Sequence, residues 1–253
     1  MIKMIVVDLD GTLLKSDKTI SDFTKDTLKS CRENGIKIVY GTARGESAKS
    51  HAPAEMFDGR INMNGAVARA KEKLLYNSMI KMDLARDLLV ACDKYGLKTA
   101  AQSDGIHYSN FDVNGEWPEM RRNFQITDFR RHNIDAEKLY TVVRNNSDVE
   151  FIKRYIPSDL YLTVSRDGLA MIMHADATKM KAINALADYW AIGKEEIVAF
   201  GDDLNDIDML VGCGVGVAMG NGVDEVKVIA DEVCETNDDD GVARWINLRI
   251  LGR

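Results

Sequence analysis

The 253-residue chain has few prolines, few cysteines and no long apolar run. Three prolines, and no tract rich in Pro or in Gly and Ser, argue against a disordered linker. The four cysteines form no CxxC pair, so we expect buried, reduced thiols rather than a zinc ribbon or a redox dithiol. No stretch approaches the roughly 18 apolar residues of a membrane span, and the apolar run Met4–Val7 is too short for a secretory signal. We therefore expect a cytoplasmic protein that has no membrane partner.

An excess of positive charge is missing as well. Asp and Glu number 40 against 33 Lys and Arg, which gives a net charge of −7. Non-specific nucleic-acid binding needs a basic face that displaces counterions, so nucleic acid is not expected as a partner. The 45% of hydrophobic residues is typical of a globular protein, and this length allows one large domain or two modest ones.

Three segments share one pattern, a short apolar run followed by a polar loop that contains glycine. They are residues 4–12, 36–44 and 196–206. Their continuous β-branched runs predict strands that are buried on both faces, as in a parallel sheet. Open parallel sheets bind ligands beyond the carboxyl ends of their strands. The three polar loops are therefore expected to lie at the ligand-binding edge of one sheet.

Amphipathic helices are expected beside these strands. The first follows the first strand and has Ser21 as its cap. Its inward side chains are predicted to be Phe23, Leu28 and Cys31. Another helix is expected to begin near Thr178 and to lead into the third strand. This alternation predicts a doubly wound, Rossmann-like α/β core.

The middle of the chain has a different pattern. A helix is predicted at residues 83–94, and strand-like runs follow at 139–143, 161–164 and 169–173. Mixed strands and helices of this kind predict an α+β insertion. We place this insertion, a substrate-selecting cap, at residues 82–173. The two halves of the core are then residues 1–81 and 174–253.

Carboxylates are concentrated in the first and third polar loops. Asp8 and Asp10 are two residues apart in an extended chain, so they face one side while Leu9 points toward the core. Gly11 then permits a tight turn. The third loop adds the polar side chains of Asp202, Asp203, Asn205 and Asp206. If the loops meet, up to five carboxylates share one small volume.

Such a cluster needs a cation. Two negative charges 4 Å apart repel by about 4 kcal/mol at an effective dielectric constant near 20. The ligands are all oxygen atoms, with no histidine or cysteine nearby, which favours Mg²⁺ over zinc. A hard cation beside a free carboxylate suits phosphoryl transfer through an aspartyl-phosphate. Thr42, at the end of the second strand, and Lys179, at the start of a helix, could hold the phosphate.

With these residues in place, the sequence resembles the phosphatases of the haloacid dehalogenase (HAD) superfamily, in the Cof-like branch with a type IIB cap. DLDGTLL (8–14) is similar to that family's first motif, and GTAR (41–44) to its second. Lys179 matches the third motif, and GDDLNDIDML (201–210) is similar to the fourth. The resemblance covers about residues 1–80 and 174–253. In the middle it rests on the position and size of the cap alone.

The resemblance implies roles for the carboxylates. Asp8 would be the nucleophile, and Asp10 the general acid and then the general base. The cofactor would be Mg²⁺, held by Asp8, Asp202 and the backbone carbonyl of Asp10. Asp206 would support the metal ligands without touching the ion, and Asp203 could do the same. For Asp203, a carboxylate that merely stabilises a helix N-terminus is an equally good reading.

The resemblance also implies a phosphate site. Thr42, Lys179 and Asn205 would bind the phosphate, with backbone help from Leu9 and Ala43. Two positions depart from the family pattern, because Ala43 and Met180 stand where glycine is usual. Lys181 lies close enough to be mistaken for the functional lysine. We favour Lys179, since it lies nearer the positive end of the helix dipole.

Several other features have ordinary structural explanations. Asp208 and His107 are expected at the surface, although His107 could instead line the inner face of the cap. The arginine doublets 121–122 and 130–131 could bind a distal anion of the substrate, but a solvated helix face is the simpler explanation for at least half of these residues. The run at 212–220 does not fit a dinucleotide fingerprint, so it predicts a glycine-rich strand and turn.

The combined expectation is a Mg²⁺-dependent phosphatase that hydrolyses a small phosphorylated metabolite, with a sugar phosphate first among the candidates. The cap is expected to close over the site and to select the leaving group. Two alternatives remain open. A phosphomutase would return the phosphoryl group to the sugar, and a non-catalytic sensor would bind a phosphometabolite without turnover. Release of free phosphate from a sugar monophosphate would distinguish the phosphatase from the phosphomutase. Tight binding without turnover would favour the sensor.

Overall fold

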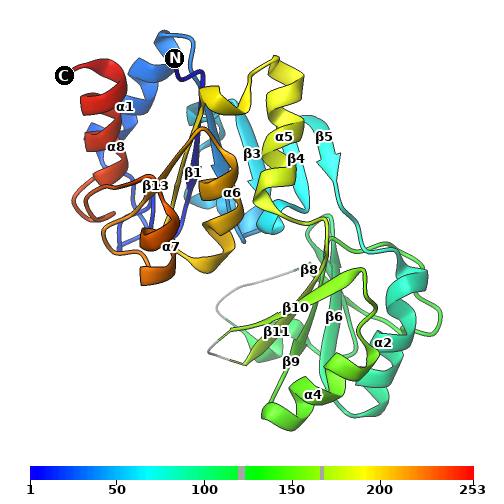
Figure 1. Cartoon of the computed structure of the whole chain (residues 1–253). Helices are drawn as coiled ribbons and strands as arrows, with labels where there is room; N and C mark the ends of the chain where they lie inside the picture. The colour runs from blue at the N-terminus through cyan, green and yellow to red at the C-terminus, as the bar shows by residue number, and fades with distance from the viewer. Residues whose placement is uncertain (119–122, 166–167) are drawn as a thin grey trace. The chain divides into compact units, whose positions relative to one another are not determined.

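The computed structural model describes residues 1–118, 123–165 and 168–253, and they form two compact units (Figure 1). Unit 1 comprises Met1–Asn77 and Ala177–Arg253, and unit 2 comprises Ser78–Asp176. Their limits lie a few residues from the predicted insertion at 82–173. Within the described ranges, no helix combines the length and the apolar character that crossing a membrane requires.

Unit 1 is built on a sheet whose strands run, across the described residues, in the order β14-β13-β12-β1-β2-β3-β4-β5. The strands from β14 to β3 are parallel, and β4 and β5 are antiparallel additions at one edge. The parallel core confirms the predicted α/β fold, whereas the β3–β5 extension was not anticipated. The strand bounds are β1 Met4–Asp8, β2 Lys37–Gly41, β3 Gly59–Asn62, β4 Val67–Ala70, β5 Lys73–Asn77, β12 Ile197–Gly201, β13 Val215–Ala218 and β14 Glu232–Val233.

Helices cover both faces of this sheet, as a doubly wound fold requires. Helices α1 and α8 pack on one face, and α5 and α6 pack on the other (Figure 1). The helix bounds are α1 Asp22–Glu33, α5 Lys179–Trp190, α6 Ile207–Gly212, α7 Asp224–Ile229 and α8 Gly241–Ile246. The predicted Ser21 cap is confirmed, because Ser21 Oγ accepts from the Thr24 N–H. The helix expected to begin near Thr178 does so, and Thr178 Oγ1 accepts from the Lys181 N–H as its cap.

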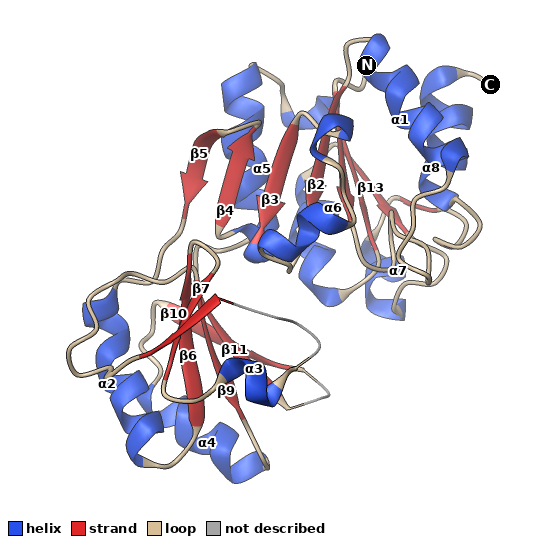
Figure 2. Cartoon of the chain, turned by 180° about the vertical axis from the view of Figure 1, so that it is seen from behind, coloured by secondary structure: helices blue, strands red, loops and turns tan. Residues whose placement is uncertain are grey.

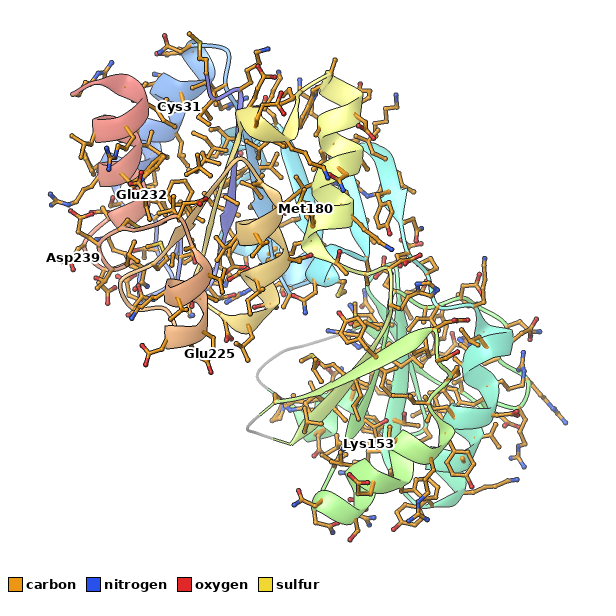
Figure 3. The ribbon with its side chains drawn as sticks, in the orientation of Figure 1. Cys31, Lys153, Met180, Glu225, Glu232 and Asp239 are labelled. Carbon is orange, nitrogen blue, oxygen red and sulfur yellow. The ribbon has the colours of Figure 1, made fainter. Side chains whose placement is uncertain are left out.

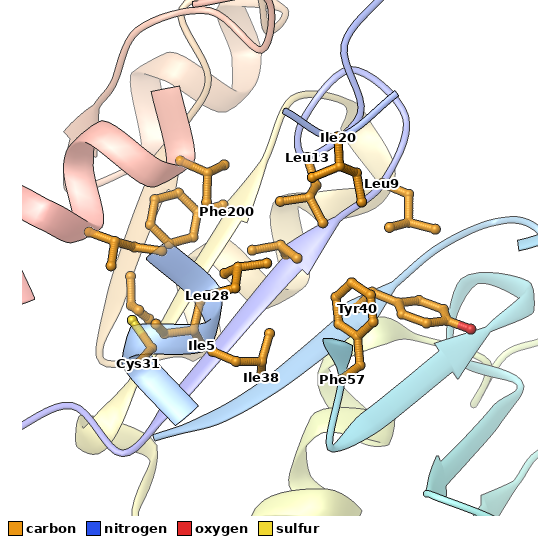
Figure 4. Packing of buried hydrophobic residues seen from close by; sticks show 14 of the residues in the cluster. Ile5, Leu9, Leu13, Ile20, Leu28, Cys31, Ile38, Tyr40, Phe57 and Phe200 are labelled. Carbon is orange, nitrogen blue, oxygen red and sulfur yellow. The ribbon is translucent and has the colours of Figure 1, made fainter. Parts of the chain in front are cut away.

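The buried face of α1 differs from the prediction at one position. Leu28 and Cys31 are buried as expected, but Phe23 is 47% exposed. Thr24 and Thr27 take the inward positions instead. One residue of offset turns a helical side chain by about 100°, which moved Phe23 off the core. The core itself brings Ile5, Leu28 and Ile38 from different elements together (Figure 4). All four cysteines are buried and free, as expected: Cys31, Cys92, Cys213 and Cys234.

Unit 2 is an α+β structure, whose described strands run in the order β10-β11-β9-β6-β7-β8. All neighbours are antiparallel except β7 and β8, which are parallel. Helices α2 and α4 lie on one face and close the core of this unit (Figure 2). The element bounds are α2 Met82–Lys94, β6 Lys98–Ser103, β7 Ile106–Ser109, α3 Val113–Glu116, β8 Asn123–Ile126, β9 Lys138–Val142, α4 Asn146–Tyr155, β10 Leu160–Val164 and β11 Leu169–His174.

One expectation about a unit 2 residue is wrong, and another is confirmed in part. His107 is buried rather than exposed, and its Nδ1 lies 2.8 Å from Tyr140 Oη. Arg130 is exposed to solvent as expected, but it lies on a turn rather than a helix, and its guanidinium pairs with Asp128. The other doublet, at 121–122, lies outside the described residues.

The strand register of unit 1 positions the polar loops. Asp8, the last residue of β1, pairs with Gly41 at the end of β2. On its other side β1 pairs with β12, so that Val7 lies opposite Phe200. The loops that begin at Leu9, Thr42 and Asp202 therefore leave neighbouring strands at the same edge of the sheet.

Candidate functional site

The loop after β1 is closely fitted to the loop after β12. Gly11 has a φ of +82°, and a Cβ there would lie 2.3 Å from Asp202 Oδ2, so only glycine fits. Thr12 donates its hydroxyl to Asp202 Oδ1 at 2.6 Å. Leu9 is fully buried in the core near Leu13 and fixes the start of the loop (Figure 4). These contacts hold the Asp202 carboxylate against the first motif.

Asp206 supports the loop after β12 from within. Its Oδ2 accepts from the backbone N–H groups of Asp202 at 2.9 Å and Asp203 at 3.1 Å. Gly201 leaves the necessary space, because a Cβ there would lie 2.4 Å from Asp206 Cβ. Asp203 itself is exposed and accepts from the Leu204 N–H at 2.7 Å. Its carboxylate therefore acts as a helix-end acceptor.

Three carboxylates converge in the interior of this edge. Asp8, Asp202 and Asp206 each present an oxygen within 4.8 Å of the others. Lys179 Nζ donates to Asp8 Oδ1 at 2.5 Å and also to Asp206 Oδ1. One ammonium thus faces three carboxylates, which leaves an excess of negative charge. The available ligand atoms are all carboxylate oxygens, and both features suit a divalent cation.

The predicted cluster of five carboxylates is smaller than expected. Among the described residues the converging group contains three carboxylates. The Asp10 carboxylate pairs with Lys18 and Arg44 instead, and Asp203 faces solvent. Of the two candidate lysines, Lys179 is 1% exposed and bonds to Asp8, whereas Lys181 is exposed. The chain therefore brings Lys179 to the carboxylates and leaves Lys181 on the outer side of α5.

Burial dominates the electrostatics of the converging group. It raises the pKa of Asp8 well above its usual value, an effect opposed by Lys179 and reinforced by Asp206. Burial likewise raises the pKa of Asp202 to about 6, although the Thr12 hydrogen bond opposes it. For Lys179, burial works against the charge, but the two bonded carboxylates outweigh it and raise the pKa. A further positive charge here would favour the ionised carboxylates.

Asp10 lies in the opposite environment, two residues along the chain. Arg44 binds its carboxylate through Nε and Nη2, both at 2.6 Å, and Lys18 Nζ lies 2.9 Å from Oδ1. Partial burial would raise the pKa of Asp10, but the hydrogen bonds from Arg44 and Lys18 prevail and lower it to about 2. Asp10 is therefore held as a carboxylate.

The loop after β2 supplies Thr42 and Arg44. Thr42 is buried, and its Oγ1 accepts from the Arg44 N–H at 3.1 Å. Ala43 between them is exposed. The turn around the Thr42 hydroxyl thus leads directly to the guanidinium that binds Asp10.

Asn205 and Asp208 contact groups outside the carboxylate cluster. Asn205 is exposed, and its Nδ2 donates to Asn64 Oδ1 at 3.0 Å. Asp208 was expected in solvent, which is wrong: it is half-buried and accepts from the Met180 N–H at 2.8 Å. Met180 lies at the start of α5, against α6 (Figure 3). Asp208 therefore joins α6 to the helix end that carries Lys179.

Sequence reasoning missed four residues at this edge of the sheet: Thr12, Lys18, Arg44 and Asn64. Thr12 and Arg44 belong to the DLDGT and GTAR motifs, so their position next to assigned residues was a usable signal. Lys18 and Asn64 lie outside those motifs. Nothing in the one-dimensional pattern distinguishes them from ordinary polar loop residues.

Comparison with known proteins gives one consistent result. A model of the haloacid dehalogenase-like hydrolases matches residues 5–246. The 5-amino-6-(5-phospho-D-ribitylamino)uracil phosphatase YitU of Bacillus subtilis is 30% identical, over 96% of this chain and 96% of its own. Among solved structures, the HAD phosphatase BT1666 of Bacteroides thetaiotaomicron has a TM-score of 0.84 at 27% identity, covering 98% of this chain and 95% of its own.

A second solved structure agrees in fold. The HAD subclass IIB sugar phosphatase BT4131 has a TM-score of 0.80 and covers 97% of this chain and 98% of its own. Its 24% identity supports the shared fold and nothing finer. The family match spans nearly the whole sequence, including all four motifs and the intervening unit 2. The chain therefore belongs to the haloacid dehalogenase superfamily, among its Cof-like phosphatases.

Proposed function

We propose that this protein is a Mg²⁺-dependent phosphatase that hydrolyses a small phosphomonoester through an aspartyl-phosphate on Asp8. The observation that carries the proposal is the group formed by the buried Asp8 and Asp206 and the half-buried Asp202, with Lys179 bonded to Asp8 and Asp206. Removing carboxylates from water around a single ammonium costs folding free energy, and such costly arrangements are typical of sites that bind ligands or perform chemistry.

The donor set fits a hard divalent cation, because every available ligand atom is oxygen. Asp8, Asp202 and the carbonyl of Asp10 would hold Mg²⁺. When bound, the ion supplies positive charge that stabilises the transferring phosphoryl group and favours ionised carboxylates. Asp206 remains engaged with Lys179 and with the backbone of the β12 loop, which suits a supporting role.

Asp8 performs the first chemical step in this proposal. One of its oxygens forms a bond to phosphorus as the bond from phosphorus to the leaving oxygen breaks, and Asp10 gives that oxygen a proton. Lys179 favours the ionised form of Asp8, because its ammonium lies 2.5 Å from Oδ1. Lys179, Thr42 and Asn205 would stabilise the charge on the phosphoryl oxygens.

The second step releases phosphate. Asp10, now a carboxylate, takes a proton from water as the water oxygen bonds to phosphorus and the bond to Asp8 breaks. The Arg44 ion pair favours the carboxylate form that this step needs. Protonation of the leaving group requires the opposite form, so Asp10 has to leave Arg44 when substrate binds.

The relatives suggest the class of substrate. YitU is named for a phosphoribityl compound and BT4131 for a sugar phosphate. Both names describe phosphate esters of a small polyhydroxylated carbon chain. We therefore place sugar and sugar-alcohol phosphates first, with unit 2 selecting the leaving group.

A substrate screen tests the proposal. Purified protein is given a panel of sugar phosphates, sugar-alcohol phosphates and 5-amino-6-(5-phospho-D-ribitylamino)uracil, with Mg²⁺ or with a chelator, and free phosphate is measured. We expect Mg²⁺-dependent release that the Asp8→Asn variant lacks. Release that persists with the chelator, or in the variant, would refute the mechanism. Transfer of phosphate within a sugar without its release would indicate a mutase.

A further inference from the structure

The segment between β3 and β4 has an unusual backbone. Met63 and Asn64 both have a φ of +51°, and Gly65 follows with a φ of +102°. Glycine adopts this region freely and asparagine tolerates it, but methionine rarely does. Three consecutive left-handed residues persist only where their surroundings fix them, and such strain is concentrated at functional sites.

The surroundings that fix this segment belong to the loop after β2. Met63 donates its N–H to the Arg44 carbonyl at 3.1 Å, and Asn64 donates its N–H to the Thr42 carbonyl at 3.0 Å. The Asn62 side chain adds bonds to the carbonyls of Arg44 and Gly45, both at 3.2 Å. The strained backbone is therefore hydrogen-bonded to the turn that contains Thr42 and stabilises it.

The same segment reaches the other two predicted phosphate ligands. A Cβ on Gly65 would lie 2.1 Å from the Thr178 carbonyl oxygen and 2.7 Å from the Lys179 nitrogen, so its backbone lies directly on the start of α5. Asn64 Oδ1 accepts from Asn205 Nδ2 at 3.0 Å. One short segment thus contacts the loops of Thr42, Lys179 and Asn205.

We propose that residues 62–65 set the geometry of the phosphate site and that Asn64 is a positioning residue for Asn205. This inference rests on the proposed function. By accepting one N–H of the Asn205 carboxamide, Asn64 fixes that otherwise exposed side chain. The second N–H of the carboxamide is then held ready for a phosphoryl oxygen. The left-handed backbone at Asn64 is what brings its side chain to Asn205.

A double-mutant cycle of Asn64→Gly and Asn205→Ala tests this coupling. Glycine accepts the left-handed backbone, so Asn64→Gly removes the side chain without straining the segment. The probe is binding of orthophosphate with Mg²⁺ by calorimetry, together with kcat and KM on the best substrate of the screen. Ala191→Gly is the matched control, since Ala191 also has a left-handed φ of +54° but caps the far end of α5.

We expect Asn64→Gly, Asn205→Ala and the double variant each to bind orthophosphate about tenfold more weakly, the loss of one hydrogen bond to a charged group. The losses should not add, and the melting temperature of Asn64→Gly should not fall. Ala191→Gly should bind as the unaltered protein does. Additive losses, or unchanged binding by Asn64→Gly, would overturn the inference. Absence of turnover in the unaltered protein would count against the proposed function alone, because the binding cycle is read independently.

Discussion

The two sides of the loop after β1 place similar carboxylates in opposite surroundings. On the inner side, Asp8 is buried with two other carboxylates and one ammonium, and its pKa is raised. On the outer side, Asp10 is half-exposed between Arg44 and Lys18, and its pKa is lowered to about 2. Neighbouring carboxyl groups whose environments separate their pKa values are typical of residues with different chemical roles.

This difference follows from the fold rather than from the residue types. Asp8 ends a strand that is buried on both faces, so its side chain remains inside the sheet edge where α5 delivers Lys179. Asp10 lies beyond the first turn of the loop, where the Arg44 guanidinium and Lys18 can reach it. The three inner carboxylates therefore outnumber their one ammonium, whereas the Asp10 carboxylate faces two cationic side chains.

The strongest disruption of the inner side is Asp8→Asn. The amide occupies the same space but cannot attack phosphorus, so we expect turnover to fall by more than about 10³-fold. The fold should persist, because burying a neutral amide is no harder than burying a charged carboxylate. Steady-state kinetics and thermal unfolding measure the two effects. The exposed Asp26→Asn is the control and should match the unaltered protein, whereas retained turnover in Asp8→Asn would refute the nucleophile.

Removing the inner ammonium should have the next largest effect. Lys179→Ala should cost about 3–4 kcal/mol of transition-state stabilisation, or roughly 100- to 1000-fold in kcat/KM. It should also lower the melting temperature, since two buried carboxylates lose their partner. Lys181→Ala is the matched control on the same helix and should change little. If Lys181→Ala were the damaging variant, the assignment of the phosphate-binding lysine would be wrong.

On the outer side, Arg44→Met should shift a pH profile. Without the guanidinium, the pKa of Asp10 should rise from about 2 toward its ordinary value of about 3.9. The base step needs the carboxylate, which is lost as pH falls through its pKa, so the acid limb of kcat should move to higher pH. Arg44→Lys keeps the charge without the two-pronged contact and should give a smaller shift. An unmoved acid limb in Arg44→Met would mean that Arg44 does not control Asp10.

The smallest expected effect is a pH-dependent stabilisation by Mg²⁺. The pKa of Asp202 is raised to about 6, so the stability it contributes is complete below about pH 4 and is lost as pH rises through 6. A bound cation offsets this loss above pH 6, whereas protons compete with it below. At saturating Mg²⁺ the melting temperature should rise by roughly 5–8 °C at pH 7.5 and by less at pH 5.

Asp202→Asn provides the control for this measurement and should reduce the Mg²⁺ effect at pH 7.5. An equal rise at both pH values, or an undiminished rise in Asp202→Asn, would place the ion elsewhere. Calcium can be compared in the same scan, because its larger coordination shell fits a small carboxylate group less well.

The sequence predicted what depends on strand order and missed what depends on side-chain pairing. Asp8 and Asp202 could be brought together because one ends and the other follows a buried strand, and parallel strands share one carboxyl edge. The two hydrogen bonds from Arg44 to Asp10 depend on the rotamers of both side chains, which the hydrophobic pattern of a sequence does not predict. The antiparallel strands β4 and β5 are short, and β5 alternates weakly, so the sequence pattern did not predict them.

The local backbone conformation between β3 and β4 could not be predicted from the sequence either. Nothing in the sequence of residues 62–66 predicts the positive φ of Met63, whose N–H is bonded to the Arg44 carbonyl in the loop after β2. The offset at Phe23 is a different kind of error. The helix, its cap and the inward positions of Leu28 and Cys31 were correct, but the inward position of the first turn belongs to Thr24 rather than to its apolar neighbour Phe23.

The most direct test of two carboxylates with separate roles is a rapid-quench measurement on Asp10→Asn with p-nitrophenyl phosphate. This leaving group departs without a proton, so Asp8 can still be phosphorylated, while loss of the base slows the second step. We predict a burst of p-nitrophenol stoichiometric with the protein, and a phosphoryl group recovered on the peptide that contains Asp8. Turnover without a burst, or a phosphoryl group on any other residue, would contradict the account.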